Sequence, residues 1–289
     1  MKQLYLKSLI LAILSFVSIT ASAEYCCVDG IYFYADTATH TAMVAAGYSP
    51  YVGEIKIPKA IVCQGKKCIV NSICSSAFRD NVDLISVTIP NSVTSIGYQA
   101  FMGCSGMTSI TIPNSVISIE DYAFDHCSSL LSINVPNSLE TIGYRVFCGC
   151  SSLTSVNIPN SVKSIGQEAF EECNSLSTVT LGDNLTYIEE FTFRNCSSLT
   201  SIEVGKNLKS IGRYSFYGCS SLKSVEIPNS VTSIEDFAFS GCSSLTFVTI
   251  PNNLTNIGSG VFSDCTSLKK VTIPNSVTNI GNYMFSGCI

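Results

Sequence analysis

The sequence predicts an α/β repeat solenoid, a column of short parallel strands stacked with turns or single helical turns between them. Two observations predict this class. A period of 23 residues runs without insertion from residue 69 to residue 289, with phenylalanine from Phe78 to Phe285 and isoleucine from Ile73 to Ile280. One such unit is too short to bury its own apolar side chains, so neighbouring units must stack to form a continuous core.

Residues 1–23 have the pattern of a secretory signal peptide. Lys2 and Lys7 give a positive start, and an apolar run without charge follows over residues 8–20. The sequence Ala21-Ser22-Ala23 then offers the small residues of a cleavage site. The run is shorter than the ~20 apolar residues that a membrane-spanning helix needs. A buried N-terminal helix is the alternative, but we expect an exported chain with no transmembrane segment after cleavage.

Each unit carries its apolar residues in the same order. In the unit that begins at Cys150 they are Leu153, Val156, Ile158, Val162, Ile165 and Phe170. Val156 and Ile158 alternate with period two, which predicts a short strand whose two side chains point inward. Pro159 lacks the N–H that a strand ladder needs, so it ends this strand.

The second half of the unit predicts a second extended segment, a bend and a helical turn. Val162 and Ile165 mark the extended segment, and Gly166 offers a sharp bend. Residues 167–170 are then expected to form a single helical turn before the next unit begins.

The repeated phrase Leu-x-x-Val-x-Ile-Pro-x-x-Val-x-x-Ile-Gly-x-x-Ala-Phe-x-x-Cys resembles the BspA-like, 23-residue class of leucine-rich repeats. The resemblance covers residues 69–289, which are expected to form a solenoid of about ten units. It implies that residues 24–68 form a β-rich N-terminal cap that starts near Val28–Tyr32. It also implies an exported or cell-surface protein that binds other macromolecules, some members being adhesins for host matrix proteins.

Two departures from the family pattern affect the expected surface. Gly182 and Gly205 stand where the other units have proline, which is expected to change the turn locally. The chain also stops at Cys288-Ile289 in mid-unit, without a capping segment. An uncapped stack leaves a strand edge, which would allow end-to-end self-association.

The fifteen cysteines are an odd number, so they cannot all pair within one chain. Nine of them, from Cys104 to Cys288, recur at one position of the repeat, where the first unit has Asn81. Asparagine cannot form a disulfide, so we expect this cysteine ladder to be reduced and buried. Cys63 and Cys68 flank a possible turn at Gly65-Lys66, which leaves open both a cross-hairpin disulfide and two free thiols.

Composition and charge argue against nucleic-acid binding. Charged residues make up 13% of the chain, about half of the usual ~25%. Without Lys2 and Lys7, 14 basic residues remain against 21 acidic ones, a net charge of −7. A net acidic chain without a basic cluster argues against nucleic-acid binding.

The sequence does not predict an enzyme, a metal site or a cofactor. The chain has two histidines, His40 and His126, and we expect His126 to be a solvated surface residue. The paired carboxylates Glu171-Glu172 and Glu189-Glu190 fall in repeat turns, where acidic residues are ordinary surface cover. No convergent acid, base and nucleophile are present, as catalysis would require.

Partner recognition must use positions at which the units differ, because the core positions repeat. The candidate partner-binding residues lie on the outward side of the strand and are Asn134, Asn157, Glu203, Glu226, Phe247 and Lys270. An exposed phenylalanine beside an acidic pair resembles an interface anchor with an electrostatic rim. A generic solvated face is the alternative. A competing surface is the turn side, whose aromatic residues are interpreted as packing and are Tyr122, Phe191, Tyr214, Phe237 and Tyr283.

We therefore expect a non-enzymatic secreted or cell-surface protein that binds a protein partner, with host extracellular matrix proteins among the candidates. A structural surface-layer component is the alternative, which the uniformity of the units supports. A carbohydrate-binding or ice-binding ladder of threonines is a third interpretation. Asn134, Asn157, Glu203 and Glu226 interrupt that threonine row, which disfavours a flat ice-binding plane.

Overall fold

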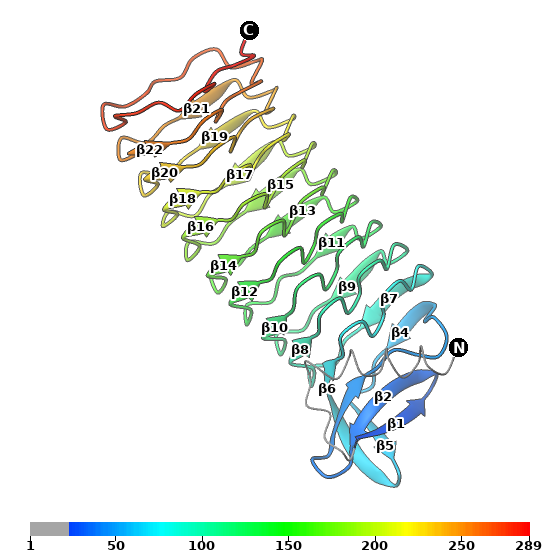
Figure 1. Ribbon diagram of the computed structural model, residues 1–289. Helices are drawn as coiled ribbons and strands as arrows, with labels where there is room; N and C mark the ends of the chain where they lie inside the picture. The colour runs from blue at the N-terminus through cyan, green and yellow to red at the C-terminus, as the bar shows by residue number, and fades with distance from the viewer. Residues whose placement is uncertain (1–22) are drawn as a thin grey trace, which may run out of the picture.

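The computed structural model describes residues 23–289, which form a single column of stacked coils (Figure 1). This part of the chain contains 22 strands and no helix. The predicted solenoid of stacked short parallel strands is confirmed, but its α/β description is wrong, because residues 23–289 form a β-solenoid. The predicted signal peptide lies outside the described residues except for Ala23.

The N-terminal end is a small sheet that continues into the solenoid. Strands β1 (Ala23–Val28), β2 (Ile31–Asp36) and β3 (Thr41–Val44) form an antiparallel meander. Strand β6 (Lys66–Ile73) pairs with β3 in parallel and with β5 (Ala60–Cys63) in an antiparallel hairpin. Because β6 also pairs with the first coil, it gives the stack a strand edge on which to grow.

Two rows of short parallel strands run along the column. The first row consists of β4 (Gly53–Lys56), β7 (Leu84–Thr88), β9 (Ser109–Thr111), β11 (Ser132–Ile133), β13 (Ser155–Asn157), β15 (Thr178–Thr180), β17 (Ser201–Glu203), β19 (Ser224–Glu226) and β21 (Phe247–Thr249). The second row continues from β6 with β8 (Ser95–Ile96), β10 (Ser118–Ile119), β12 (Thr141–Ile142), β14 (Ser164–Ile165), β16 (Tyr187–Ile188), β18 (Ser210–Ile211), β20 (Ser233–Ile234) and β22 (Asn256–Ile257). From β7 and β6 onward, paired residues in these rows are 23 positions apart, as in Val156 opposite Val179. Strand β4 differs, because its residues pair with β7 over 31 or 32 positions.

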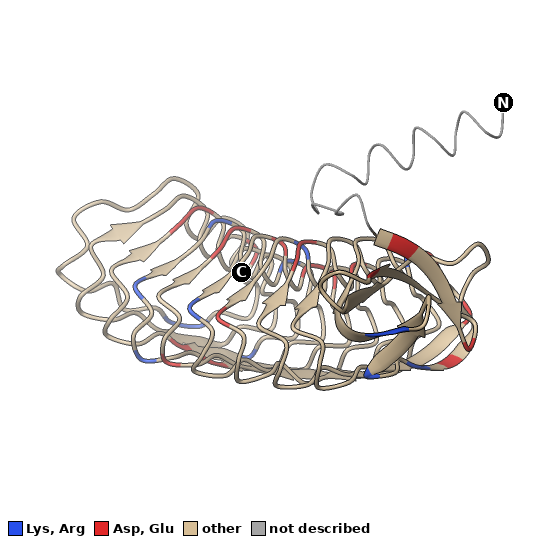
Figure 2. Cartoon of the chain, turned by 90° about the horizontal axis from the view of Figure 1, so that it is seen from below, with Lys and Arg blue, Asp and Glu red and all other residues tan. Residues whose placement is uncertain are grey.

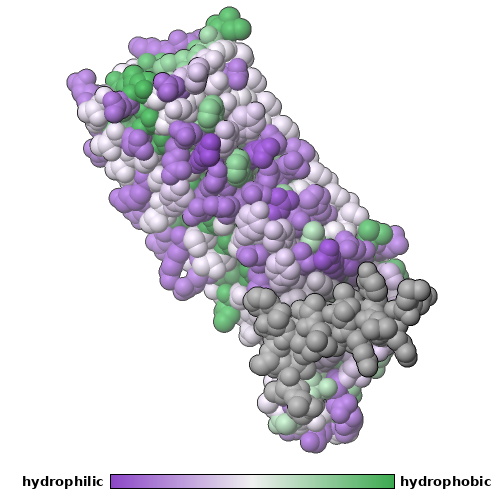
Figure 3. Space-filling view, viewed as in Figure 1, coloured by the Kyte–Doolittle hydropathy of each residue, from purple (hydrophilic) through white to green (hydrophobic). Residues whose placement is uncertain are grey.

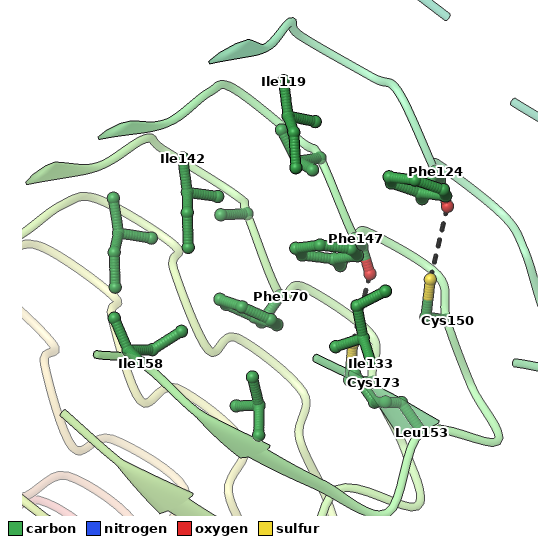
Figure 4. Close-up of a cluster of buried hydrophobic side chains, with 14 of the residues drawn as sticks. Ile119, Phe124, Ile133, Ile142, Phe147, Cys150, Leu153, Ile158, Phe170 and Cys173 are labelled. Carbon is green, nitrogen blue, oxygen red and sulfur yellow. Dashed lines mark hydrogen bonds between the residues drawn. The ribbon is translucent and has the colours of Figure 1, made fainter. Parts of the chain in front are cut away.

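The core is one continuous cluster along the column, and the predicted inward residues occupy it. Val156, Ile158 and Ile165 are all buried, so the predicted strand and second extended segment are confirmed. The phenylalanines form a stack of nearly parallel rings (Figure 4), with centroids 4.9 Å apart at Phe78–Phe101 and 5.9 Å apart at Phe262–Phe285. This stack fixes one side of every coil.

The predicted helical turn over residues 167–170 is wrong. Each unit has two residues four positions apart in the left-handed backbone region, such as Glu168 at φ 58° and Glu172 at φ 59°. The N–H of Phe170 donates to the carbonyl of Thr192 in the next coil, at 2.9 Å, and not to a residue of its own turn. A helix would instead satisfy this donor four residues back. Hydrogen bonding between coils therefore replaces the local helix.

Gly166 is required for a reason other than the predicted bend. Its φ is not positive, so its backbone conformation does not demand glycine. A Cβ at this position would lie 2.7 Å from the carbonyl carbon and oxygen of Gly143 in the preceding coil. Real Cβ atoms do not approach so closely, so glycine here allows close stacking of the two backbones.

The cysteine ladder is free of disulfides, as expected from the sequence, and it is buried except for the partly exposed Cys288. Each thiol donates a hydrogen bond to a phenylalanine carbonyl of the preceding coil, as from Cys150 to Phe124 at 3.3 Å and from Cys173 to Phe147 at 3.2 Å (Figure 4). Burial raises the pKa of the Cys173 thiol well above its ordinary value. Such thiols pack as small apolar groups with a weak donor.

A disulfide between Cys63 and Cys68 is not formed. The hairpin turn is at Gln64-Gly65, so Cys63 lies opposite Lys66 and Cys68 lies opposite Ile61. The two cysteines are therefore out of register across the hairpin. Cys63 instead forms a disulfide with Cys26, the Cα atoms being 6.2 Å apart.

Replacing Phe170 by alanine should lower the free energy of unfolding by roughly 3–5 kcal/mol, because a buried ring is lost from the stack. Phe247→Ala is the matched control, since Phe247 is 57% exposed and its loss should change stability by no more than about 0.5 kcal/mol. Urea denaturation of both variants measures the difference. Equal losses would contradict the register of the core.

Thiol titration should separate the exposed Cys27 from the eight buried ladder cysteines, Cys104 to Cys265. Only a thiolate reacts readily, and burial disfavours the thiolate. Cys27 should therefore react in the folded chain, and the ladder only after denaturation. Mass spectrometry that found a disulfide between Cys150 and Cys173 would overturn the ladder geometry.

Candidate binding face

The exposed side of the first strand row, here called the strand face, carries all six candidate residues, and each of them is exposed. Asn157 on β13 and Glu203 on β17 lie in one row with Thr180 of β15 between them. Glu226 ends β19, the next strand along, and pairs with Thr249 of β21. The structure thus places these residues in a line along the solenoid axis.

Asn134 has a structural role that the sequence did not reveal. Its side-chain oxygen accepts the N–H of Ile112 at 3.0 Å, and its amide nitrogen donates to the carbonyl of Ile112 at 2.7 Å. The side chain therefore takes the place of a backbone strand partner just after β11. Half of its hydrogen-bonding capacity is used within the protein.

A hollow of about 600 Å³ lies on the strand face where two successive units have glycine in place of proline. This glycine hollow has Gly182 and Gly205 in its lining, together with Asn157, Asn160, Thr180, Asp183 and Glu203. A Cβ on Gly182 would lie 2.7 Å from the carbonyl oxygen of Pro159, so the backbones approach too closely here for any larger residue. The replacement of proline by glycine is visible in the sequence, but a hollow at these two units was not predicted from it.

The wall of the glycine hollow beyond the strand ends is held by hydrogen bonds between coils. Asn160 accepts the backbone N–H of Asp183 at 2.7 Å, and Asp183 accepts that of Lys206 at 3.1 Å. The Lys206 ammonium also lies 2.9 Å from the Asp183 carboxylate. Hydrogen bonds from the Lys206 side chain and backbone lower the pKa of Asp183, which stays ionised at neutral pH. Neither Asn160 nor Asp183 was among the residues predicted from the sequence.

The strand-row wall of the glycine hollow carries a second carboxylate. Glu203 accepts a hydrogen bond of 3.4 Å from the Thr180 hydroxyl. Over residues 23–289, no lysine, arginine or histidine forms an ion pair with Glu203. The hollow therefore has a carboxylate on each side, and only Asp183 has a cationic neighbour.

A second hollow of about 350 Å³ lies further along the same face. This aromatic hollow includes Phe247, Pro251, Lys270 and Pro274 in its lining. Phe247 is 57% exposed and forms an isolated parallel bridge with Lys270. The structure thus brings the predicted phenylalanine and lysine together, whereas Glu226 lies between the two hollows and lines neither.

The turn-side aromatics do not line a hollow of the strand face, and all of them except the exposed Tyr283 pack against neighbouring rings. Phe191 and Phe237 stack on the two faces of Tyr214, with ring centroids 5.3 Å and 5.0 Å apart. All three residues occupy the left-handed backbone position of their unit. The Arg213 guanidinium lies 5.0 Å from the Tyr214 ring centroid and covers it further. This arrangement agrees with their interpretation as packing.

The interpretation of Glu171 as surface cover is wrong, because its side chain is buried while that of Glu172 is exposed. Arg194 lies 3.0 Å and Arg145 lies 3.6 Å from the Glu171 carboxylate. Burial and the hydrogen bond shared with Glu168 raise the pKa of Glu171 to about 7. This cluster could not be predicted from the sequence, since its two arginines come from the coils before and after the glutamates.

Charged residues of both signs are interspersed along the coils (Figure 2), so neither sign covers the whole solenoid. Polar residues dominate the face in Figure 3, with apolar residues gathered near the C-terminal end. Over residues 23–289, no group of three or more histidine, cysteine, aspartate or glutamate side chains could hold a metal ion. The same residues include no helix long and apolar enough to span a membrane.

Stacked 23-residue coils with a buried apolar ladder define a β-solenoid of the leucine-rich-repeat class. The family model described as BspA type leucine rich repeat region (6 copies) matches residues 71–199 and 163–289. The chain therefore belongs to the BspA-type leucine-rich-repeat family, as its resemblance implied. Membership supports a non-enzymatic repeat protein with a protein-binding or surface role.

Two solved structures are similar to this chain. The chain is 30% identical to the T. pallidum leucine-rich repeat protein TpLRR, over 70% of this chain and 88% of that one, with a TM-score of 0.58. It is 25% identical to a leucine-rich cell surface protein from Faecalibacterium prausnitzii, over 86% and 94% of the two chains, with a TM-score of 0.41. No curated protein matches the chain by sequence.

The raised pKa of Glu171 should make stability depend on pH. The Glu171 carboxyl group is harder to ionise in the folded state than in the unfolded state. Its contribution to the stability of the fold is therefore complete below its unfolded pKa, about 4.5, and is lost as pH rises to about 7. From pH 5 to pH 8, the wild type should therefore lose roughly 1–3 kcal/mol of unfolding free energy relative to Glu171→Gln, whose amide does not titrate. Urea denaturation at both pH values gives this difference. A difference that does not change with pH would contradict the shift.

Proposed function

We propose that this chain is an exported, non-enzymatic binding protein that recognises a protein partner through its strand face. The main support is that both hollows lie on this face, at units that depart from the repeat. They contain Glu203, Phe247 and Lys270, so an aromatic anchor is accompanied by charges of both signs. Protein interfaces combine such an anchor with a polar rim. Adhesion to an extracellular matrix protein of a host is the specific form of binding that we propose.

Export is supported by two features of the chain. Residues 1–23 have the composition of a signal peptide. The disulfide between Cys26 and Cys63 is typical of an oxidising compartment. Burial of the ladder thiols, as at Cys173, is compatible with such a compartment because an oxidant does not reach them. We propose that cleavage leaves a mature chain from residue 24, with the cap at residues 24–68 and the solenoid at residues 69–289.

Self-association is a second candidate, favoured by the exposed apolar residues of the last coil. Ile280 is 58% exposed and Tyr283 is 74% exposed, whereas their counterparts in earlier coils pack against neighbours. Contact between two such ends would cover these side chains. Sedimentation of the mature chain at increasing concentration tests this candidate separately from binding of a different partner.

Binding of the mature chain to immobilised matrix proteins and glycans tests the main proposal. Against a protein that binds, Glu203→Lys and Phe247→Ala should each weaken affinity about tenfold, as for an interface hot spot. Tyr214→Ala and Phe237→Ala are the turn-side controls, and they should leave affinity unchanged. A loss of affinity in the two turn-side variants alone would show that the binding site lies on the turn side. Binding to glycans alone would contradict a protein partner.

A further inference from the structure

The glycine hollow is shaped for more than one side chain. Its volume is about 600 Å³, and its lining comes from three successive coils through Asn157, Thr180 and Glu203. Three strands at about 4.8 Å spacing span roughly 10 Å, which is the length of about three residues of an extended chain. The hollow therefore matches a short extended peptide that lies along the solenoid axis.

The charge of the hollow selects the chemistry of its occupant. Asp183 and Glu203 are in the lining, which contains no lysine or arginine. The ammonium of Lys206 is held by Asp183 and lies outside the lining. Glu203 is exposed and has only the weak hydrogen bond from Thr180. A ligand with a positive group at this position would gain an ion pair that the protein itself does not supply.

The neutral part of the lining would complement such a ligand. The side chains of Asn157 and Asn160 provide amide oxygens, which accept hydrogen bonds from ammonium or guanidinium groups. The Asn160 oxygen already accepts the N–H of Asp183, so its orientation is fixed before any ligand binds. A wall that is ordered in advance costs little conformational entropy on binding.

We infer that the glycine hollow binds a lysine or arginine side chain presented on an extended segment of the partner protein. The inference rests on the proposed protein-binding function, since it names the partner chemistry for one part of the strand face. Glu203 forms the ion pair with the cation. Gly182 and Gly205 contribute only backbone atoms to the lining, since neither residue has a side chain.

Hexalysine is a suitable probe, and Glu203→Gln is the test variant, because it removes the charge with little change of shape. Glu172→Gln is the matched control, since Glu172 is an exposed carboxylate on the turn side that lines neither hollow. Calorimetric titration at low salt should show that Glu203→Gln weakens hexalysine binding at least threefold. The control should bind like the wild type, and hexaglutamate should not bind. Thermal unfolding of both variants verifies that they are folded.

Equal loss in the two variants would show attraction to the acidic chain as a whole and would overturn the inference. No loss in Glu203→Gln would overturn it as well. The outcomes also separate the inference from the proposed function. If a matrix protein binds through Phe247 but is insensitive to Glu203→Gln, the function stands and the inference fails. If hexalysine binds through Glu203 while no matrix protein binds, the inference about the glycine hollow is supported and the proposed adhesion is contradicted.

Discussion

Stacking of coils of equal length is the constraint on which the rest of this structure depends. Within the solenoid, each residue lies beside its counterpart of the neighbouring coil, 23 positions away, as Val179 lies between Val156 and Ile202. Ring stacking between phenylalanines and hydrogen bonds from side chains such as Thr200 to the preceding coil all repeat at this spacing. An insertion in one unit would shift all of these contacts together. The unbroken period in the sequence follows from this requirement.

The regular features could be predicted because the repeat itself encodes them. The inward row at Val156 and Ile158, the buried phenylalanines and the free cysteine ladder all follow from side chains that recur in register. The turn side could not be predicted in the same way. Glu168 and Glu172 carry no sign of a left-handed backbone, since neither is glycine or asparagine. Their conformation is imposed by hydrogen bonds to the next coil, which local sequence does not show.

Long-range contacts account for the remaining differences between sequence and structure. The Cys26–Cys63 disulfide depends on where β1 meets β5, and the spacing of cysteines along the chain does not reveal it. In the binding face, the exposure of Glu203, Phe247 and Lys270 was predictable from their outward position. The wall formed by Asn160 and Asp183 was not, because it depends on hydrogen bonds between residues of successive coils. Thus a fixed core carries a face whose shape is set by single substitutions.

The direction of the turn-side hydrogen bonds has a consequence for how such a chain is built. The N–H of Phe170 is satisfied by Thr192, and that of Phe193 by Ser215, so each coil depends on the one that follows it. A chain that emerges N-terminus first therefore presents the sheet edge of β6 as a template, and each arriving coil completes its predecessor. However many coils have formed, the turn-side N–H groups of the most recent coil still lack their acceptors. Each added coil supplies the acceptors that its predecessor lacks, and lengthening the column by whole repeats leaves the coils already in place undisturbed.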